Sequence, residues 1–149
     1  MITTKTQAKY IEWLSTDEMH QASKKWYSEL CFIKDEQLFF DDLIKTYTLQ
    51  LLEEKKFASN RKVVDALYLS QKRNDELLEI IKTHRNELEI LVDGINQPKE
   101  EAIYKKEHKE LVFIMSEFFI DYQNLKTKLF KLFKAILKAE KDSHLIDKK

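Results

Sequence analysis

Glycine and proline, the residues that most often interrupt regular secondary structure, each occur once in the 149 residues of this chain. They stand close together, as Gly94 and Pro98, so the rest of the sequence contains neither. A turn-rich β-sandwich, a Gly-rich phosphate loop and a dinucleotide-binding fingerprint all need glycines that this chain lacks. The sequence therefore restricts the fold to one with few turns and long uninterrupted elements.

Apolar residues recur at alternating spacings of four and three along three long stretches, which is the pattern of helices that bury one stripe. The stripes run from Met19 to Leu51, from Val63 to Ile95 and from Tyr104 to Ile136. The strict alternation of apolar and polar residues that marks a strand does not occur in the sequence. We therefore predict an all-α fold, an elongated antiparallel up-down-up bundle of three long helices preceded by a short N-terminal helix or arm.

The helix boundaries follow from capping signals. Residues 15–18 read Ser-Thr-Asp-Glu, a capping box. Gly94 suits the end of one helix, and Pro98 suits the first turn of the next. Near residue 57 the signal is weaker, because Ser59 or Asn60 can cap a helix but a continuous helix is the alternative. The predicted organisation is an arm or short helix at 1–15, a bundle at 16–142 with helices at about 16–55, 60–93 and 98–141, and a tail at 143–149.

The composition indicates a soluble chain that needs no covalent cross-links. The chain carries 26 basic and 26 acidic residues, so its formal net charge is zero, and 43% of its residues are hydrophobic. Its one cysteine, Cys31, cannot form an intrachain disulfide. The N-terminal stretch lacks the apolar core of a signal peptide, and no apolar run approaches the roughly 20 residues of a membrane span. We expect no transmembrane segment and a cytoplasmic location.

Two histidines and the cysteine are weak candidates for a metal site. Folding the predicted hairpins places His84 level with His108, and Cys31 at the same level on the first helix. Zinc accepts these ligand types, but Cys31 points about 150° away from the apolar stripe of its helix at 100° per residue. Di-iron bundles place an acidic residue three positions before each ligating histidine, where this chain has Ile81 and Lys105. We therefore predict no metal and no cofactor, and two hydrogen-bonded histidines in or beside the core.

Asn74 interrupts the second apolar stripe and is predicted to be buried. The same hairpin geometry brings it near Ser70 and Tyr122, so we expect it to bond one of their hydroxyls and to set the alignment of the helices. Contact with a ligand is the alternative for this residue. No serine or cysteine has a base and an orienting acid at a predictable place beside it, which nucleophilic catalysis requires. We therefore expect a protein that is not an enzyme.

The zero net charge hides an uneven distribution. In the predicted bundle, residues 41–73 and 123–149 share one end, which carries 15 Lys or Arg and 8 Asp or Glu. Such an end suggests binding to an anionic surface, a lipid membrane or a nucleic acid, although the scarcity of arginine, with three in the chain, disfavours nucleic acid. The structural alternative is that the lysines near the helix C-terminus are there because they interact favourably with the negative end of the helix dipole. The residues of this basic end are Lys62, Arg73, Lys128, Lys131, Lys134, Lys138 and Lys141.

The first and third helices carry more apolar residues than one buried stripe accommodates. Exposed apolar patches usually mark interfaces, so we predict a non-enzymatic helical interaction or scaffold module. A homodimer is the favoured assembly, and the alternatives are another helical protein or cover by the N-terminal arm. The interface candidates are Phe32, Leu38, Phe39, Leu43, Phe113 and Ile120.

Overall fold

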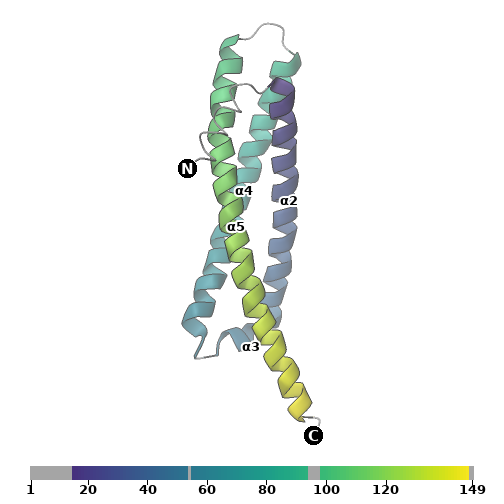
Figure 1. The fold of residues 1–149 in the computed structure, drawn as a ribbon, viewed down its shortest axis with the longest axis vertical. Helices are drawn as coiled ribbons and strands as arrows, with labels where there is room; N and C mark the ends of the chain where they lie inside the picture. The colour runs from purple at the N-terminus through teal and green to yellow at the C-terminus, as the bar shows by residue number, and fades with distance from the viewer. Residues whose placement is uncertain (1–14, 54, 94–97, 148–149) are drawn as a thin grey trace. The chain divides into compact units, whose positions relative to one another are not determined.

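The computed structural model describes residues 15–53, 55–93 and 98–147 (Figure 1). This part of the chain contains the helices α2 (Thr16–Thr46), α3 (Thr48–Leu51), α4 (Phe57–Asp93) and α5 (Pro98–Asp147), and it contains no strand. The all-α class and the presence of three long helices are therefore confirmed. The predicted arm at 1–15 lies, apart from Ser15, outside the described residues.

Two predicted helix starts are confirmed. The backbone N–H of Glu18 donates to the Ser15 hydroxyl oxygen at 3.2 Å, and α2 begins at the residue after this cap. Helix α5 begins at Pro98. An N–H in the first turn has no acceptor within the helix, so the N–H that proline lacks is not missed there. Glu100 in the same turn interacts favourably with the positive end of the helix dipole.

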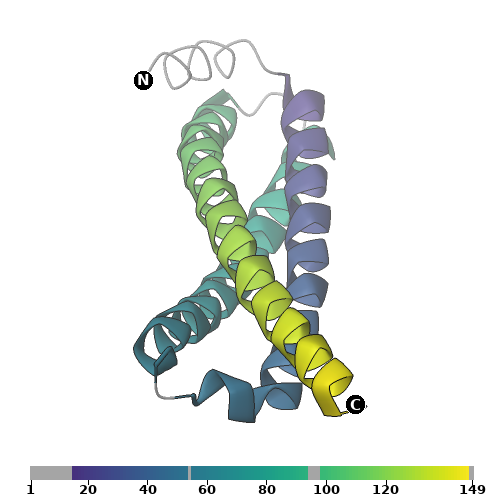
Figure 2. The same cartoon turned by 60° about the horizontal axis from the view of Figure 1, so that its bottom comes forward.

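The end of the first long helix differs from the prediction. Helix α2 ends at Thr46 and does not run to about residue 55. The next residue, Tyr47, has φ −109° and ψ 29°, which breaks the regular helix before the short helix α3. Figure 2 shows α3 between α2 and α4 along the chain. The alternative of one continuous helix through this region is therefore also wrong.

Helix α4 begins at Phe57, three residues before the predicted start. The predicted cap Asn60 lies within the first turn of this helix, where its backbone N–H donates to the carbonyl of Lys56 at 2.9 Å. Its buried side-chain amide donates instead to the Leu51 carbonyl of α3 at 3.2 Å. The asparagine thus satisfies the C-terminal carbonyl of one helix and does not cap the start of the next.

The C-terminal helix is longer than predicted. Helix α5 continues to Asp147, so most of the predicted tail at 143–149 is helical. The sequence after Pro98 contains no glycine or proline, and it is rich in the good helix formers lysine, leucine and glutamate. No helix in the described ranges has both the length and the apolar content needed to cross a lipid bilayer.

The chain divides into two compact units. The first unit is formed by residues 1–33 and 74–120, and the second by residues 34–73 and 121–149. In the first unit, Met19 of α2 packs with Leu88 of α4 and Tyr104 of α5, while Asn74 of α4 reaches Leu30 of α2. Residue numbers therefore rise along α2 as they fall along α4, and these two segments are antiparallel within the unit.

The second unit contains its own aromatic and aliphatic core. The rings of Phe40 of α2 and Phe130 of α5 meet edge-on with their centroids 5.4 Å apart. The ring centroids of Tyr47 and Phe133 are 6.4 Å apart. Most predicted stripe positions are buried in both units, each large apolar side chain contributing roughly 1.5–3 kcal/mol. At the end of the third stripe, Phe133 is buried and the predicted Leu132 is only half-buried.

Candidate functional site

A pair of buried histidines lies in the first unit. His84 of α4 and His108 of α5 are both 0% exposed, and His84 Nε2 is 3.0 Å from His108 Nδ1. Both occupy positions of the apolar stripe of their helix, so the periodicity that buries leucines elsewhere buries two imidazoles here. The predicted meeting of these two residues is confirmed, and so is their placement in the core.

An aromatic ring stacks on each of the two histidines. The Tyr104 ring stacks on His84 with centroids 4.0 Å apart and an angle of 8° between the planes. Trp26 of α2 stacks on His108 at 4.9 Å and 23°. These rings exclude water from the imidazole faces, and they fix the plane in which each ring nitrogen points.

Burial holds both imidazoles in the neutral state. It lowers the pKa of His84 to about 3, to which the neighbouring His108 contributes, and it lowers the pKa of His108 to about 4. A neutral imidazole has one N–H and one lone pair, so one of the two rings donates in the bond between them. If His84 Nε2–H is the donor, the lone pair of His84 lies on Nδ1, at the other side of the ring.

Two glutamates border the Nδ1 side of His84. Glu107 Oε1 lies 3.6 Å from His84 Nδ1, which exceeds the usual 2.7–3.2 Å of an N–H···O hydrogen bond. Glu87 stands three residues after His84 on α4, and the ligand atoms of the three residues all lie within 4.8 Å of one another. Desolvation and the neighbouring Glu87 raise the pKa of the Glu107 carboxyl. The arrangement is therefore an imidazole nitrogen and two carboxylates at one point, which suits a proton or a cation.

The structure separates the three metal candidates that the sequence suggested. His84 belongs to the cluster of His84, Glu87 and Glu107. His108 contacts the other ring nitrogen of His84, and Cys31 is exposed and is not part of the cluster. Helix α2 places Trp26 against His108, so its register relative to the histidines differs from the predicted one.

Sequence reasoning missed both glutamates. It looked for an acidic residue three positions before each histidine, whereas Glu87 follows His84 by three and Glu107 precedes His108 by one. The usable signal was the i, i+3 spacing of His84 and Glu87 on one helix. Because His84 and His108 lie at the same level, Glu107, which precedes His108, comes beside His84.

The three predicted buried polar residues do not bond one another. Asn74 is fully buried, and its amide donates to the Leu30 carbonyl at 3.0 Å within the first unit. Ser70 is half-buried and accepts a hydrogen bond from Gln37 at 3.1 Å within the second unit. The prediction of a bond from Asn74 to Ser70 or Tyr122 is wrong, because the polar groups of α2 take up all three.

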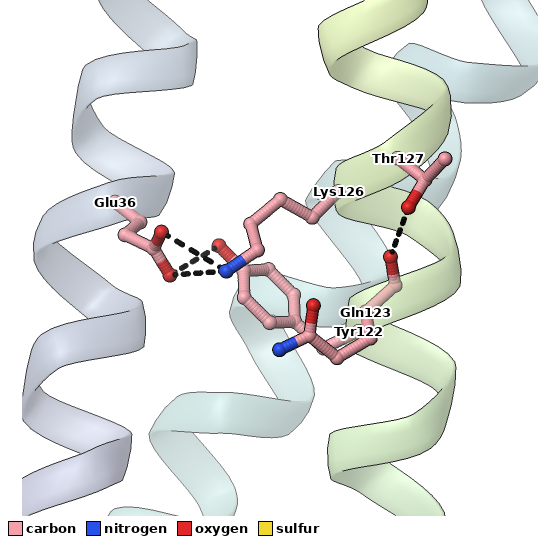
Figure 3. A network of polar contacts seen from close by, with 5 residues as sticks. All are labelled: Glu36, Tyr122, Gln123, Lys126 and Thr127. Atoms are coloured by element: carbon pink, nitrogen blue, oxygen red, sulfur yellow. Dashed lines mark hydrogen bonds and ion pairs between the residues drawn. The ribbon is translucent and has the colours of Figure 1, made fainter.

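Tyr122 lies in a small polar network of the second unit (Figure 3). Its hydroxyl donates to a Glu36 carboxylate oxygen at 3.3 Å, and the Lys126 ammonium pairs with the other oxygen at 3.3 Å. Burial of the ring and the charge of Glu36 raise the pKa of the Tyr122 phenol above its usual range. The network joins α2 to α5 and keeps a carboxylate satisfied at the edge of the core.

The surface candidates lie largely where the sequence placed them. Of the predicted interface residues, four are exposed and two, Leu43 and Phe113, are half-buried. All seven residues of the predicted basic end are exposed. On α5 the lysines alternate with buried residues of the second core, Leu125, Leu129 and Phe133. The apolar side of this amphipathic helix is therefore packed at these three positions, while Leu132 and Ile136 are half-buried.

Comparison with family models, with curated proteins and with solved structures finds no match to this chain.

Proposed function

We propose that this chain is a non-enzymatic helical interaction module that assembles with a second copy of itself. The observation that carries the proposal is the number of large apolar side chains that project into solvent. Phe32 is 62% exposed, Leu38 53%, Phe39 55% and Ile120 62%. Single exposed apolar residues are ordinary, but Phe32 and Phe39 share one face of α2 at a spacing of seven residues, which is typical of a contact surface. Leu38 lies about 100° around the same helix from Phe39.

A second copy is favoured as the partner by charge. The first unit contains 10 basic and 15 acidic residues, and the second contains 16 basic and 11 acidic residues. Each unit therefore meets its electrostatic complement in the opposite unit of another copy. Complementary potentials raise association rates and select the orientation, while the apolar residues supply most of the affinity.

Light scattering behind a sizing column tests this proposal. We expect the parent chain to elute with twice the mass of one chain, and Leu38→Glu and Phe39→Glu to elute as folded monomers with unchanged circular dichroism. Ile90→Glu is the matched control, because Ile90 is also exposed, at 68%, but lies on α4. A parent that is monomeric at every concentration refutes self-association, and variants that assemble like the parent refute this surface.

A second candidate function is binding to an anionic surface through the basic end. Its support is that Lys128, Lys131, Lys134, Lys138 and Lys141 are all exposed along α5. Because Leu125, Leu129 and Phe133 of α5 are buried in the second core, we expect such binding to be mainly electrostatic. It predicts retention on anionic vesicles that falls steeply with added salt, and equal recovery with neutral vesicles at low salt would contradict it.

A further inference from the structure

We propose that His84, Glu87 and Glu107 bind a divalent first-row transition-metal ion. The three side chains come from two helices of the first unit, His84 and Glu87 from α4 and Glu107 from α5. Their ligand atoms lie within 4.8 Å of one another. The proposal concerns a site apart from the surfaces assigned to assembly, so it does not depend on the proposed function.

The buried imidazole is the observation that distinguishes this cluster from an ordinary group of surface carboxylates. His84 is 0% exposed, and among the described residues its Nδ1 has no hydrogen-bond partner. A buried polar atom without a partner costs free energy, so it calls for an unseen donor or ion. Nδ1 lies 3.6 Å from Glu107 Oε1, and when Nδ1 carries its lone pair, either a proton or a cation between the two atoms relieves their repulsion.

The second nitrogen of His84 is held as a metal-binding histidine requires. A ligating imidazole commonly donates its other N–H to a neighbouring group, which fixes the tautomer and the ring plane. Here His84 Nε2 has His108 Nδ1 at 3.0 Å, and the Tyr104 ring stacks on His84. In the tautomer in which Nε2–H donates to His108, the lone pair lies on Nδ1, beside the two carboxylates.

The distances and donor types indicate the class of ion. In a tetrahedral site with bonds of about 2.0–2.1 Å, neighbouring ligand atoms are about 3.3 Å apart. The separation of 3.6 Å between His84 Nδ1 and Glu107 Oε1 is close to this value, and the ligand atom of the exposed Glu87 lies within 4.8 Å of both. One nitrogen and two oxygens suit Zn²⁺, Co²⁺ or Mn²⁺, whereas Mg²⁺ and Ca²⁺ prefer oxygen ligands alone. The exposure of Glu87 leaves a coordination position for water.

Calorimetric titration of untagged, chelator-treated protein with Zn²⁺ tests the proposal, and Co²⁺ absorption spectra report the ligand geometry. We expect one ion per chain and a dissociation constant at least about tenfold weaker in Glu87→Gln and Glu107→Gln. Glu89→Gln is the matched control, an exposed glutamate of the same helix that should bind like the parent. Mg²⁺ should not compete with Zn²⁺ at equal concentration.

Two results would overturn the proposal. One is the absence of saturable Zn²⁺ or Co²⁺ binding, which would mean that a shared proton satisfies Glu87 and Glu107. The other is binding that Glu87→Gln and Glu107→Gln leave unchanged, which would place the ion elsewhere. His84→Gln alters the core, so the two glutamate variants, whose side chains reach solvent, carry the test. Because these variants leave Leu38 and Phe39 intact, loss of metal binding and loss of assembly are separate outcomes.

Discussion

Acidification from pH 8 to pH 5 should destabilise the protein through the two buried histidines. In the folded state the pKa values of His84 and His108 are about 3 and about 4, so both rings are neutral at pH 5. In the unfolded chain each has the ordinary value of about 6.5 and is protonated at that pH. The unfolded state therefore binds more protons, and the free energy of unfolding falls as the pH falls through 6.5 toward the folded values.

The magnitude follows from the unfolded pKa alone, since pH 5 lies above both folded values. For each histidine, pH 5 lies about 1.5 units below the unfolded pKa, and at 1.36 kcal/mol per unit the free energy of unfolding falls by about 2 kcal/mol. The pair therefore lowers the free energy of unfolding by about 4 kcal/mol between pH 8 and pH 5, a large share of the usual 5–15 kcal/mol. Glu107 acts in the opposite direction, because its raised pKa lets the folded state hold a proton more tightly than the unfolded state.

Urea denaturation at both pH values, in a chelator-containing buffer, measures the effect. The comparison is between the parent and His84→Gln/His108→Gln, which retains Glu107 and should lose most of the difference between pH 8 and pH 5. Ile33→Val is the control, because a methyl lost from a buried non-titrating residue costs about 0.5–1.5 kcal/mol at both pH values. If the parent and the double variant lose the same stability on acidification, the two histidines are not its source.

Two further substitutions test the polar contacts of α2. Asn74→Ala removes a buried hydrogen bond to the Leu30 carbonyl and leaves a small void, so we expect the free energy of unfolding in urea to fall by about 1–3 kcal/mol. A fall below about 0.5 kcal/mol would show that the contact contributes little. Tyr122→Phe removes the 3.3 Å hydrogen bond to Glu36, and we expect the free energy of unfolding to fall by about 0.5–1.5 kcal/mol. The control is Thr127→Val, on the exposed side of the same helix, which should be close to neutral.

The sequence predicted the secondary structure and the buried stripes because those depend on local spacing. One glycine and one proline, a capping box at Ser15 and a spacing of four and three residues are properties of single helices. The helix starts at Thr16 and Pro98 therefore agree with the prediction. The break after Thr46 was missed, because no glycine or proline marks it in the sequence.

What the sequence determined by itself is that this chain is all-helical, that His84 and His108 lie on buried stripes, and that apolar residues remain on the surface. Only the tertiary structure decided which groups those stripes bring together. Helix rotation and register are set by the packing of many side chains at once, and a shift of a few residues replaces Cys31 with Trp26 beside the histidines. The same packing turns His84 Nδ1 toward Glu87 and Glu107, which periodicity along one helix cannot reveal.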